Sequence, residues 1–113
     1  MGKDDKKNLD LENLSDLDKT IHSPTRLKIL AVLLTVEEAD FTFIARTGNI
    51  TRGNLSANLQ KLESEGYIKI KKMFVDKVPK TIAQITPAGR EALAEYSSKL
   101  GSVLDELRGY TKT

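Results

Sequence analysis

The sequence predicts a mainly α fold with one small β-hairpin, an α+β arrangement of a single domain. Apolar residues recur at steps of three and four over most of the chain, which is the period of amphipathic helices. An alternation with a two-residue period is confined to residues 67–86, which leaves room for two short strands. The 113 residues are enough for one hydrophobic core and too few for two ordinary domains.

The first predicted helix covers residues 9–22 and follows a disordered tail over residues 1–8. Its apolar side chains fall on one face at helical spacing: Leu11, Leu14, Leu17 and Ile21. A second helix begins at the Ser23-Pro24 pair, because serine caps the free N–H groups of a first turn and proline fits the first helical position. Its apolar residues go most of the way round between residues 26 and 34, which predicts the most buried helix of the domain.

Two further helices separated by a short turn predict a helix-turn-helix. Asp40 caps the first of them, residues 41–47, and Gly48 is expected to end it in a left-handed conformation. Thr51 caps the second, residues 52–65. The core-facing residues of this second helix are Leu55, Leu59 and Leu62.

Residues 67–74 form the first predicted strand, with Ile68 and Ile70 on one face and the lysines largely on the other. A loop over residues 75–80 leads to a second strand over residues 81–86. The pair is expected to make a β-hairpin with a basic tip.

The Thr86-Pro87 pair repeats the cap-and-proline start and opens a last helix over residues 88–108, before a tail over residues 109–113. Apolar residues recur along one face of this helix, and the face has more turns than one small domain can bury. We therefore expect the two terminal helices to form a homodimer interface. Its predicted residues are Leu14, Leu17, Leu93, Tyr96, Leu100, Val103 and Leu107. The alternative is that the N-terminal helix packs along this stripe within one subunit.

Positive charge is concentrated in the middle of the chain. Residues 42–90 carry nine Lys/Arg and three Asp/Glu, a net charge of +6, whereas both flanking segments are mildly acidic. This asymmetry indicates a surface that binds a polyanion; an ordinary solvated basic face is the alternative.

The residue types that metal, redox or nucleophilic chemistry needs are scarce. The chain has no cysteine and a single histidine, His22, and no nucleophile or Gly-rich phosphate loop accompanies its acidic pairs. We therefore expect no catalytic residue, no metal, no cofactor and no enzymatic activity. The charged N-terminus is unlike a secretion signal and the chain has no long apolar run, so we expect a cytoplasmic protein without a membrane partner.

Four short motifs between residues 23 and 93 occur in a familiar order. They are SPTRLKIL from residue 23, TRGNLS from residue 51, LESEGYI from residue 62, and PKT followed by ITPAGR over residues 79–90. In this order the stretch resembles the small winged helix-turn-helix transcriptional regulators of the MarR/ArsR-like group, archaeal and bacterial. The resemblance implies a DNA-binding domain over residues 23–87 in a homodimeric regulator. It also implies that the helix 51–65 enters the major groove of a pseudo-palindromic site and that the 67–86 hairpin is a wing on the flanking backbone.

Turning the leucines of the helix 52–65 inward predicts which residues of this recognition helix face the DNA. They are Thr51, Arg52, Gly53, Asn54, Ser56, Ala57, Gln60 and Lys61. Gly53 and Ala57 are small enough for the backbone to approach the groove floor, although Gly53 is also explained as a turn residue. Asn54, Ser56 and Gln60 offer neutral donors and acceptors of the kind that read base edges.

Arg52 follows Thr51 at the amino terminus of the recognition helix, where it can meet a phosphate or a guanine edge, and the sequence leaves both roles open. The lysines of the hairpin are expected to contact phosphates, because lysine is a mobile point charge. They are Lys69, Lys71, Lys72, Lys77 and Lys80. Their alternative role is to keep an exposed sheet edge soluble.

Two other functions compete with a DNA-binding regulator. A winged helix can serve as a protein–protein interaction module, with its basic face on an acidic partner. The neutral hydrogen-bonding side chains of the recognition helix favour DNA over that alternative. A regulator that responds to a small molecule held near the terminal helices also stays open, because no residue identifies an effector.

Overall fold

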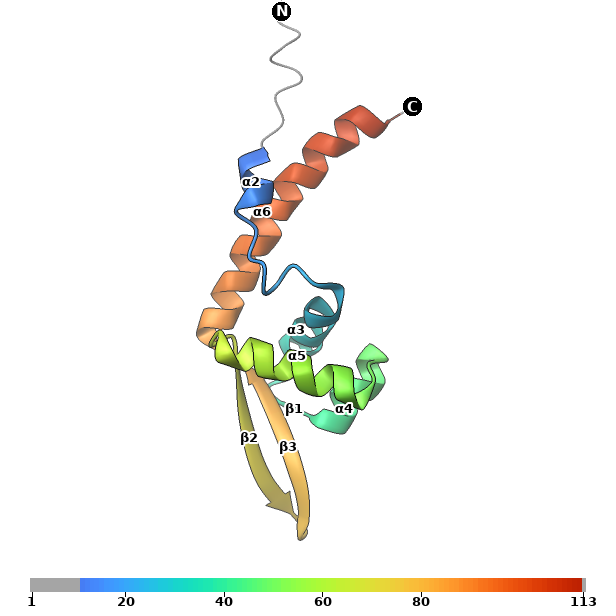
Figure 1. Ribbon diagram of the computed structural model, residues 1–113, viewed down its shortest axis with the longest axis vertical. Helices are drawn as coiled ribbons and strands as arrows, with labels where there is room; N and C mark the ends of the chain where they lie inside the picture. The colour runs from blue at the N-terminus through green and yellow to red at the C-terminus, as the bar shows by residue number, and fades with distance from the viewer. Residues whose placement is uncertain (1–10, 113) are drawn as a thin grey trace, which may run out of the picture.

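The structure, a computed structural model, describes residues 11–112, so the predicted tail over residues 1–8 lies outside it. The elements follow in the order α2 (Leu11–Ser15), α3 (Pro24–Thr35), β1 (Ala39–Asp40), α4 (Phe41–Gly48), α5 (Arg52–Ser64), β2 (Ile68–Val75), β3 (Val78–Ile85) and α6 (Pro87–Thr111) (Figure 1). The three strands form an antiparallel sheet in the order β1-β3-β2. The predicted mainly α fold with a small β-hairpin is confirmed. Within residues 11–112, no helix combines the length and apolar character needed to cross a bilayer.

Four helices begin at the caps that the sequence predicts. Each cap side chain accepts a hydrogen bond from the backbone N–H three residues further on. The four cap oxygens are those of Ser23 (3.3 Å), Asp40 (2.8 Å), Thr51 (3.3 Å) and Thr86 (3.0 Å). Proline occupies the first turn of α3 and of α6, where its missing N–H costs no intrahelical bond. These starts are therefore fixed by local chemistry.

The N-terminal helix predicted over residues 9–22 is wrong in its second half, because α2 ends at Ser15. The Asp18 carboxylate instead accepts hydrogen bonds from the backbone N–H groups of Thr20 and Ile21, at 2.9 and 3.1 Å. An Asp side chain that bonds its own backbone offers the chain an alternative to the helix. The segment turns there, yet Ile21 is still fully buried.

The loop predicted over residues 75–80 is also wrong, because only Asp76 and Lys77 separate β2 from β3. Both residues have positive φ, 53° and 67°. Positive φ at both central positions makes a two-residue turn whose twist matches that of the paired strands. Neither residue is glycine, so the usual sequence signal for this tight turn is missing.

The structure also differs from the prediction at the end of α4, at the end of α6 and in an additional short strand. Asn49, with φ of 53°, takes the left-handed position after α4 that was expected for Gly48. Gly48 is instead buried, and a Cβ there would lie 2.8 Å from Cδ1 of Ile50. Strand β1 has only two residues, too few to show a period. Helix α6 continues to Thr111, so the tail predicted over 109–113 begins too early.

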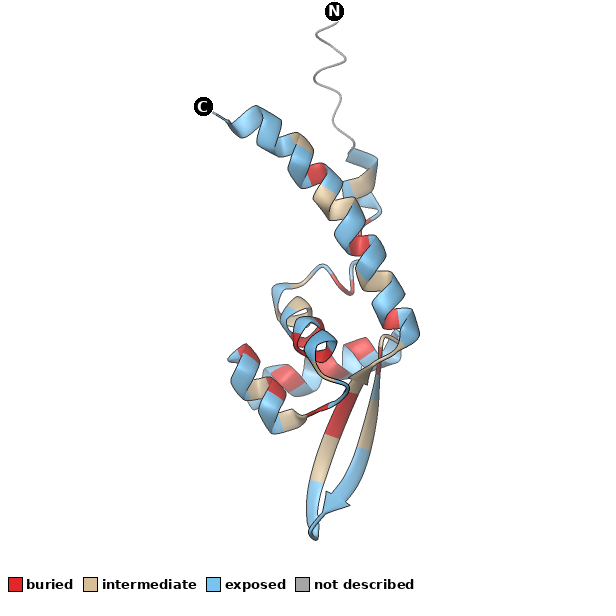
Figure 2. Ribbon diagram, turned by 180° about the vertical axis from the view of Figure 1, so that it is seen from behind, coloured by how far each residue is buried: buried red, intermediate tan, exposed pale blue. Residues whose placement is uncertain are grey.

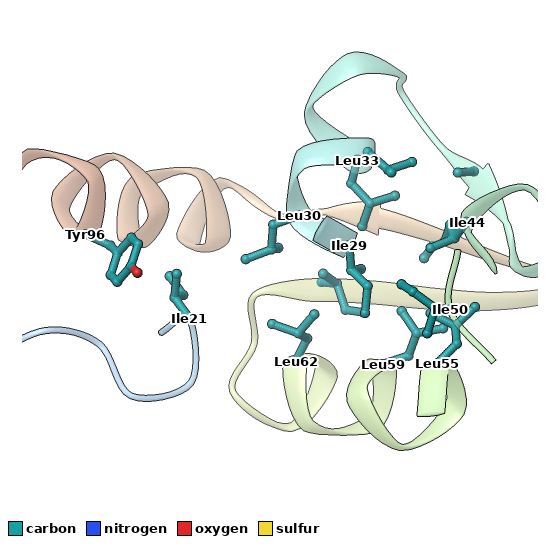
Figure 3. Packing of buried hydrophobic residues seen from close by; sticks show 14 of the residues in the cluster. Ile21, Ile29, Leu30, Leu33, Ile44, Ile50, Leu55, Leu59, Leu62 and Tyr96 are labelled. Atoms are coloured by element: carbon teal, nitrogen blue, oxygen red, sulfur yellow. The ribbon is translucent and has the colours of Figure 1, made fainter. Parts of the chain in front are cut away.

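Helix α3 lies at the centre of the hydrophobic core, as its apolar sequence predicts. Ile29, Leu30 and Leu33 are fully buried, and Ile29 lies between α3 and the buried leucines of α5 (Figure 3). Burial decreases outward from this centre, so that the far half of the hairpin is exposed (Figure 2). The core thus holds α5 against one side of α3. The face of α5 that points away from α3 is exposed to solvent.

The N-terminal segment joins the domain to the long helix α6. Helix α2 packs against α6 within one chain (Figure 1). Ile21 lies beside Tyr96 of α6 (Figure 3), and the Tyr96 hydroxyl is 2.7 Å from Nδ1 of His22. The Tyr67 hydroxyl donates a hydrogen bond to Asp18. These contacts tie the segment before α3 to both α6 and Tyr67, the residue before β2.

Candidate nucleic-acid interface

Helix α5 presents a polar face to solvent, opposite the core. Leu55, Leu59 and Leu62 are buried against the core, which confirms the predicted inward face. All eight residues predicted to face DNA are exposed: Thr51, Arg52, Gly53, Asn54, Ser56, Ala57, Gln60 and Lys61. The structure therefore brings this set together on one helical surface.

The hairpin places its lysines on two faces rather than one. Side chains alternate along a strand, so Lys69 and Lys71 lie on the face opposite Ile68 and Ile70, as predicted. Lys72 shares the face of Ile70, which corrects the expectation that the lysines lie largely opposite. This is also the face that turns toward α5, because Ile70 and Lys72 line a groove with Gln60.

Two of the five wing lysines pair with acidic side chains near β1. The Lys71 ammonium lies 3.9 Å from a Glu38 carboxylate oxygen, and the Lys80 ammonium lies 3.4 Å from Asp40. The pKa of Asp40 is lowered, first by the hydrogen bond from the Phe43 backbone N–H and further by Lys80. Asp40 thus stays charged and offsets part of the positive charge of Lys80.

The tip of the hairpin is more apolar than its lysines predict. Phe74 is 75% exposed, and Val75 and Val78 are exposed beside it. Lys77 is exposed within the turn. The basic tip predicted from the lysines is therefore a mixed surface, because the short turn brings the flanking apolar residues to its end.

A concave surface separates the outer face of α5 from the hairpin. One hollow, of about 230 Å³, is lined by α5 residues including Ser56 and Gln60 and by Lys72 of β2. A second, of about 330 Å³, extends between Arg52 and β3. Phe41 lines both, and the Arg52 guanidinium carbon lies 4.9 Å from the centre of its ring. Stacking on an aromatic ring holds this cation beside the groove.

Hydrogen bonds connect the outer face of α5 to α3. Arg26 Nη1 donates to Oδ1 of Asn58 at 2.9 Å, and Asn58 Nδ2 donates to both the main-chain oxygen and Oδ1 of Asn54, at 2.8 Å each. Asn58 is not among the residues that the sequence predicts to face DNA. The i, i+4 spacing of Asn54 and Asn58 was the available signal, since such residues are neighbours on a helix.

The predicted dimer residues differ in exposure within one chain. Leu17, Tyr96 and Val103 are buried, and Leu93 and Leu100 are half-buried. The remaining two predicted residues are exposed, together with three apolar residues that the prediction missed. These five exposed residues are Leu11, Leu14, Leu104, Leu107 and Tyr110. The intrachain packing considered as the alternative therefore accounts for part of the stripe.

Helices α4 and α5 form a helix-turn-helix, and the following β2-β3 hairpin is a wing at its side (Figure 1). This arrangement defines a winged helix domain in which the outer face of α5 is exposed. The chain belongs to the winged helix DNA-binding domain family, whose model matches residues 25–104. The resemblance inferred from the motifs is confirmed at this level.

Several known proteins are similar to the chain. An uncharacterized protein of Methanocaldococcus jannaschii is 40% identical over 78 residues, which are 69% of this chain and 85% of that protein. The structure of a transcriptional regulator homologue from Pyrococcus horikoshii OT3 is 34% identical, with a TM-score of 0.78, and the match covers 85% of this chain and 97% of that one.

Two more distant structures share the fold. A MarR-family transcriptional regulator from Silicibacter pomeroyi is 19% identical with a TM-score of 0.55, over 80% of this chain and 57% of that one. The transcriptional repressor CouR, bound to a 23-mer DNA duplex, is 23% identical with a TM-score of 0.68, over 90% of this chain and 70% of that one.

Proposed function

We propose that this protein is a DNA-binding transcriptional regulator whose helix α5 enters the major groove while the β2-β3 wing contacts the flanking backbone. The observation that carries the proposal is the outer face of α5, where eight polar or small residues are exposed together beside a concave surface. The winged helix DNA-binding family and the regulator from Pyrococcus horikoshii, at 34% identity, support the same function.

The roles within this surface follow from chemistry. Gly53 and Ala57 present little side-chain bulk, so the helix backbone can come close to the base edges. Asn54 and Gln60 supply side-chain amides that read bases. Lys72 lies on the wing face that turns toward α5 and is placed to neutralise a phosphate.

We propose that the regulator acts as a homodimer on a pseudo-palindromic site. The exposed apolar side chains of α2 and the distal half of α6 give two copies a surface to bury. A two-fold dimer would present two recognition helices about 34–36 Å apart, the spacing of successive major grooves on one face of the duplex.

Charge reversal of Lys72 tests the role of the wing. Lys72→Glu should weaken binding to duplexes of any sequence and lower the slope of log K against log salt by about 0.9 for each phosphate that the protein no longer neutralises. Fluorescence anisotropy titrations between about 50 and 200 mM salt measure this slope. The matched control is Lys112→Glu, which makes the same charge change beyond the end of α6 and should leave the slope unchanged. Equal slopes for both variants would remove the wing from the proposal.

The apolar wing tip favours protein binding as a second candidate function. Phe74, Val75 and Val78 are exposed at the end of the hairpin, where a purely backbone-contacting wing needs charge instead. If Phe74→Ser leaves DNA affinity unchanged but abolishes a protein contact found by crosslinking in cells, the wing serves that partner.

A further inference from the structure

Three residues connect the core to the outer face of α5 through side-chain hydrogen bonds. Asn54 is exposed in the first turns of α5, Asn58 is half-buried one turn later, and Arg26 reaches Asn58 from α3. The Arg26 side chain is itself held, because its Nε donates to the main-chain oxygen of Thr20. The order of donors is thus Arg26 to Asn58 to Asn54.

Two groups that cannot exchange donor and acceptor roles determine which way the Asn58 amide is turned. A guanidinium has donors only, so the Asn58 atom that faces Arg26 must be the carbonyl oxygen. The Asn58 NH₂ group is then turned toward Asn54, where it meets a main-chain oxygen that can only accept. Both contacts oppose reversal of the Asn58 amide. The same NH₂ group donates to Oδ1 of Asn54, so the Asn54 carbonyl turns inward and its NH₂ group turns outward.

An outward NH₂ group favours some bases over others. In the major groove guanine offers the acceptors N7 and O6, and thymine offers O4. Adenine offers N7 alone, beside an amino donor that opposes a second donor, and cytosine offers an amino donor without any acceptor on this edge. An asparagine reads adenine well only when it presents both its oxygen and its nitrogen.

We propose that Arg26 and Asn58 are positioning residues that fix the Asn54 amide as a donor, and that α5 therefore selects guanine or thymine at the base that Asn54 meets. This inference rests on the proposed function, since it specifies how the same helix reads its site. Asn58 itself need not contact the DNA.

Selection from random duplexes with the full-length protein locates the position read by Asn54. Wild-type protein should enrich a sequence, and Asn54→Ala should lose the preference at one position in each half-site. That position should be guanine or thymine in the wild-type selection. Adenine or cytosine there would overturn the inference and leave the proposed function intact. Failure of the wild type to enrich any sequence would overturn both.

Asn58→Asp reverses the relevant bond while keeping the acceptor for Arg26. The carboxylate can only accept, so it should draw the Asn54 NH₂ group inward and turn the Asn54 oxygen outward. The selected base should change from guanine or thymine to adenine or cytosine. Ser64→Asp is the control, because it adds the same charge at an exposed position of α5 outside the chain of bonds. It should weaken binding without changing the base, whereas an unchanged base with Asn58→Asp would overturn the inference.

Base analogues test the wild-type protein without any question of folding. Replacing the selected guanine by 7-deazaguanine removes the N7 acceptor, and replacing a selected thymine by 5-methyl-2-pyrimidinone removes O4. Loss of the acceptor should raise Kd by about fivefold or more, the lower end of the discrimination that a base contact gives. The analogue should change Kd for Asn54→Ala by less than about twofold, since that variant has no amide to pair with the acceptor. Equal changes for both proteins would overturn the inference.

Discussion

Gly53 occupies the first turn of α5, on the face proposed to meet DNA. Apart from its chain neighbours and the backbone of its own helix, no described atom lies within 4 Å of the Cβ that alanine would add, so Gly53→Ala meets no neighbouring element. The substitution should stabilise the fold by up to about 1 kcal/mol, because alanine loses less backbone entropy in a helix. It should nevertheless weaken DNA binding severalfold, since the added methyl group would stand between the helix and the groove floor. Thermal unfolding and anisotropy titration measure the two opposite effects. Unchanged affinity would leave Gly53 as a turn residue only.

Tyr67 makes the free energy of unfolding decrease with rising pH in the alkaline range. Its hydroxyl donates to Asp18, and this bond raises the pKa of Tyr67 from its ordinary value of 10.0 to about 12. The folded protein therefore holds the proton more tightly than the unfolded chain. The resulting stabilisation is complete below pH 10 and is lost as the pH rises through about 12.

Tyr67→Phe should therefore lower the free energy of unfolding by about 1.5–3 kcal/mol at neutral pH, the usual range for a hydrogen bond to a charged acceptor. The difference from wild type should shrink as the pH rises above 10. Urea denaturation at about pH 7 and about pH 11, on either side of the ordinary tyrosine pKa, measures both values. A difference that stays constant with pH would contradict the assignment of this bond as a stabilising one.

At the scale of elements, helix starts were predictable and turns were not. Ser23, Asp40, Thr51 and Thr86 act through bonds to residues three positions away, so their effect is visible in the sequence. The Asp76-Lys77 turn depends on the pairing of two strands, which imposes positive φ on two residues that are not glycine. The end of α2 likewise depends on tertiary contacts, because Asp18 also accepts a bond from Tyr67.

The start of α6 packs too closely on Tyr67, the residue before β2, to admit any side chain at Gly89. A Cβ at Gly89 would lie 2.2 Å from the main-chain oxygen of Tyr67 and 3.0 Å from Cγ1 of Ile85. Gly89→Ala must therefore push the helix from the sheet and should cost about 1–3 kcal/mol of stability. The matched control is Gly101→Ala in the same helix, where no described atom lies within 4 Å of the added Cβ.

Gly101→Ala should stabilise the protein by about 0.5–1 kcal/mol through helix propensity alone. Chemical denaturation of both variants separates packing from propensity, because the two changes have opposite expected signs. Stabilisation by Gly89→Ala would show that the start of α6 does not pack against the Tyr67 main chain as described.

At the scale of the whole molecule, the sequence predicts the part of the proposed DNA-binding surface that lies on α5. It does not predict the contacts that other elements add to this surface. The buried leucines of α5 fix its outer face, so the exposed set could be found from periodicity. The ion pairs of Lys71 and Lys80 depend on a two-residue strand that no pattern indicates. The bond from Arg26 to Asn58 spans 32 positions of the chain and requires the packing of α3 on α5.

The proposed dimer interface lies on the distal half of α6, which extends beyond the domain. Tyr96 and Val103 are already buried by the chain's own contacts, so further association must use the side chains that remain exposed. Leu104 and Leu107 lie in the distal half of α6 and are partly accessible. Replacing both by glutamate would place two charges in any interface formed there, at a cost that a small dimer cannot offset.

The double variant Leu104→Glu, Leu107→Glu should therefore sediment as a monomer at concentrations where wild type is a dimer. The control Ser97→Glu, Ser98→Glu adds the same charge to exposed positions of α6 nearer the domain and should stay dimeric. The monomeric variant should still bind a single half-site, because α5 and the wing are untouched, but should lose its preference for an inverted repeat. Analytical ultracentrifugation with and without duplex measures both properties. A double variant that remains dimeric would place the interface elsewhere, and a monomeric wild type that still prefers an inverted repeat would mean that the two copies associate only on DNA.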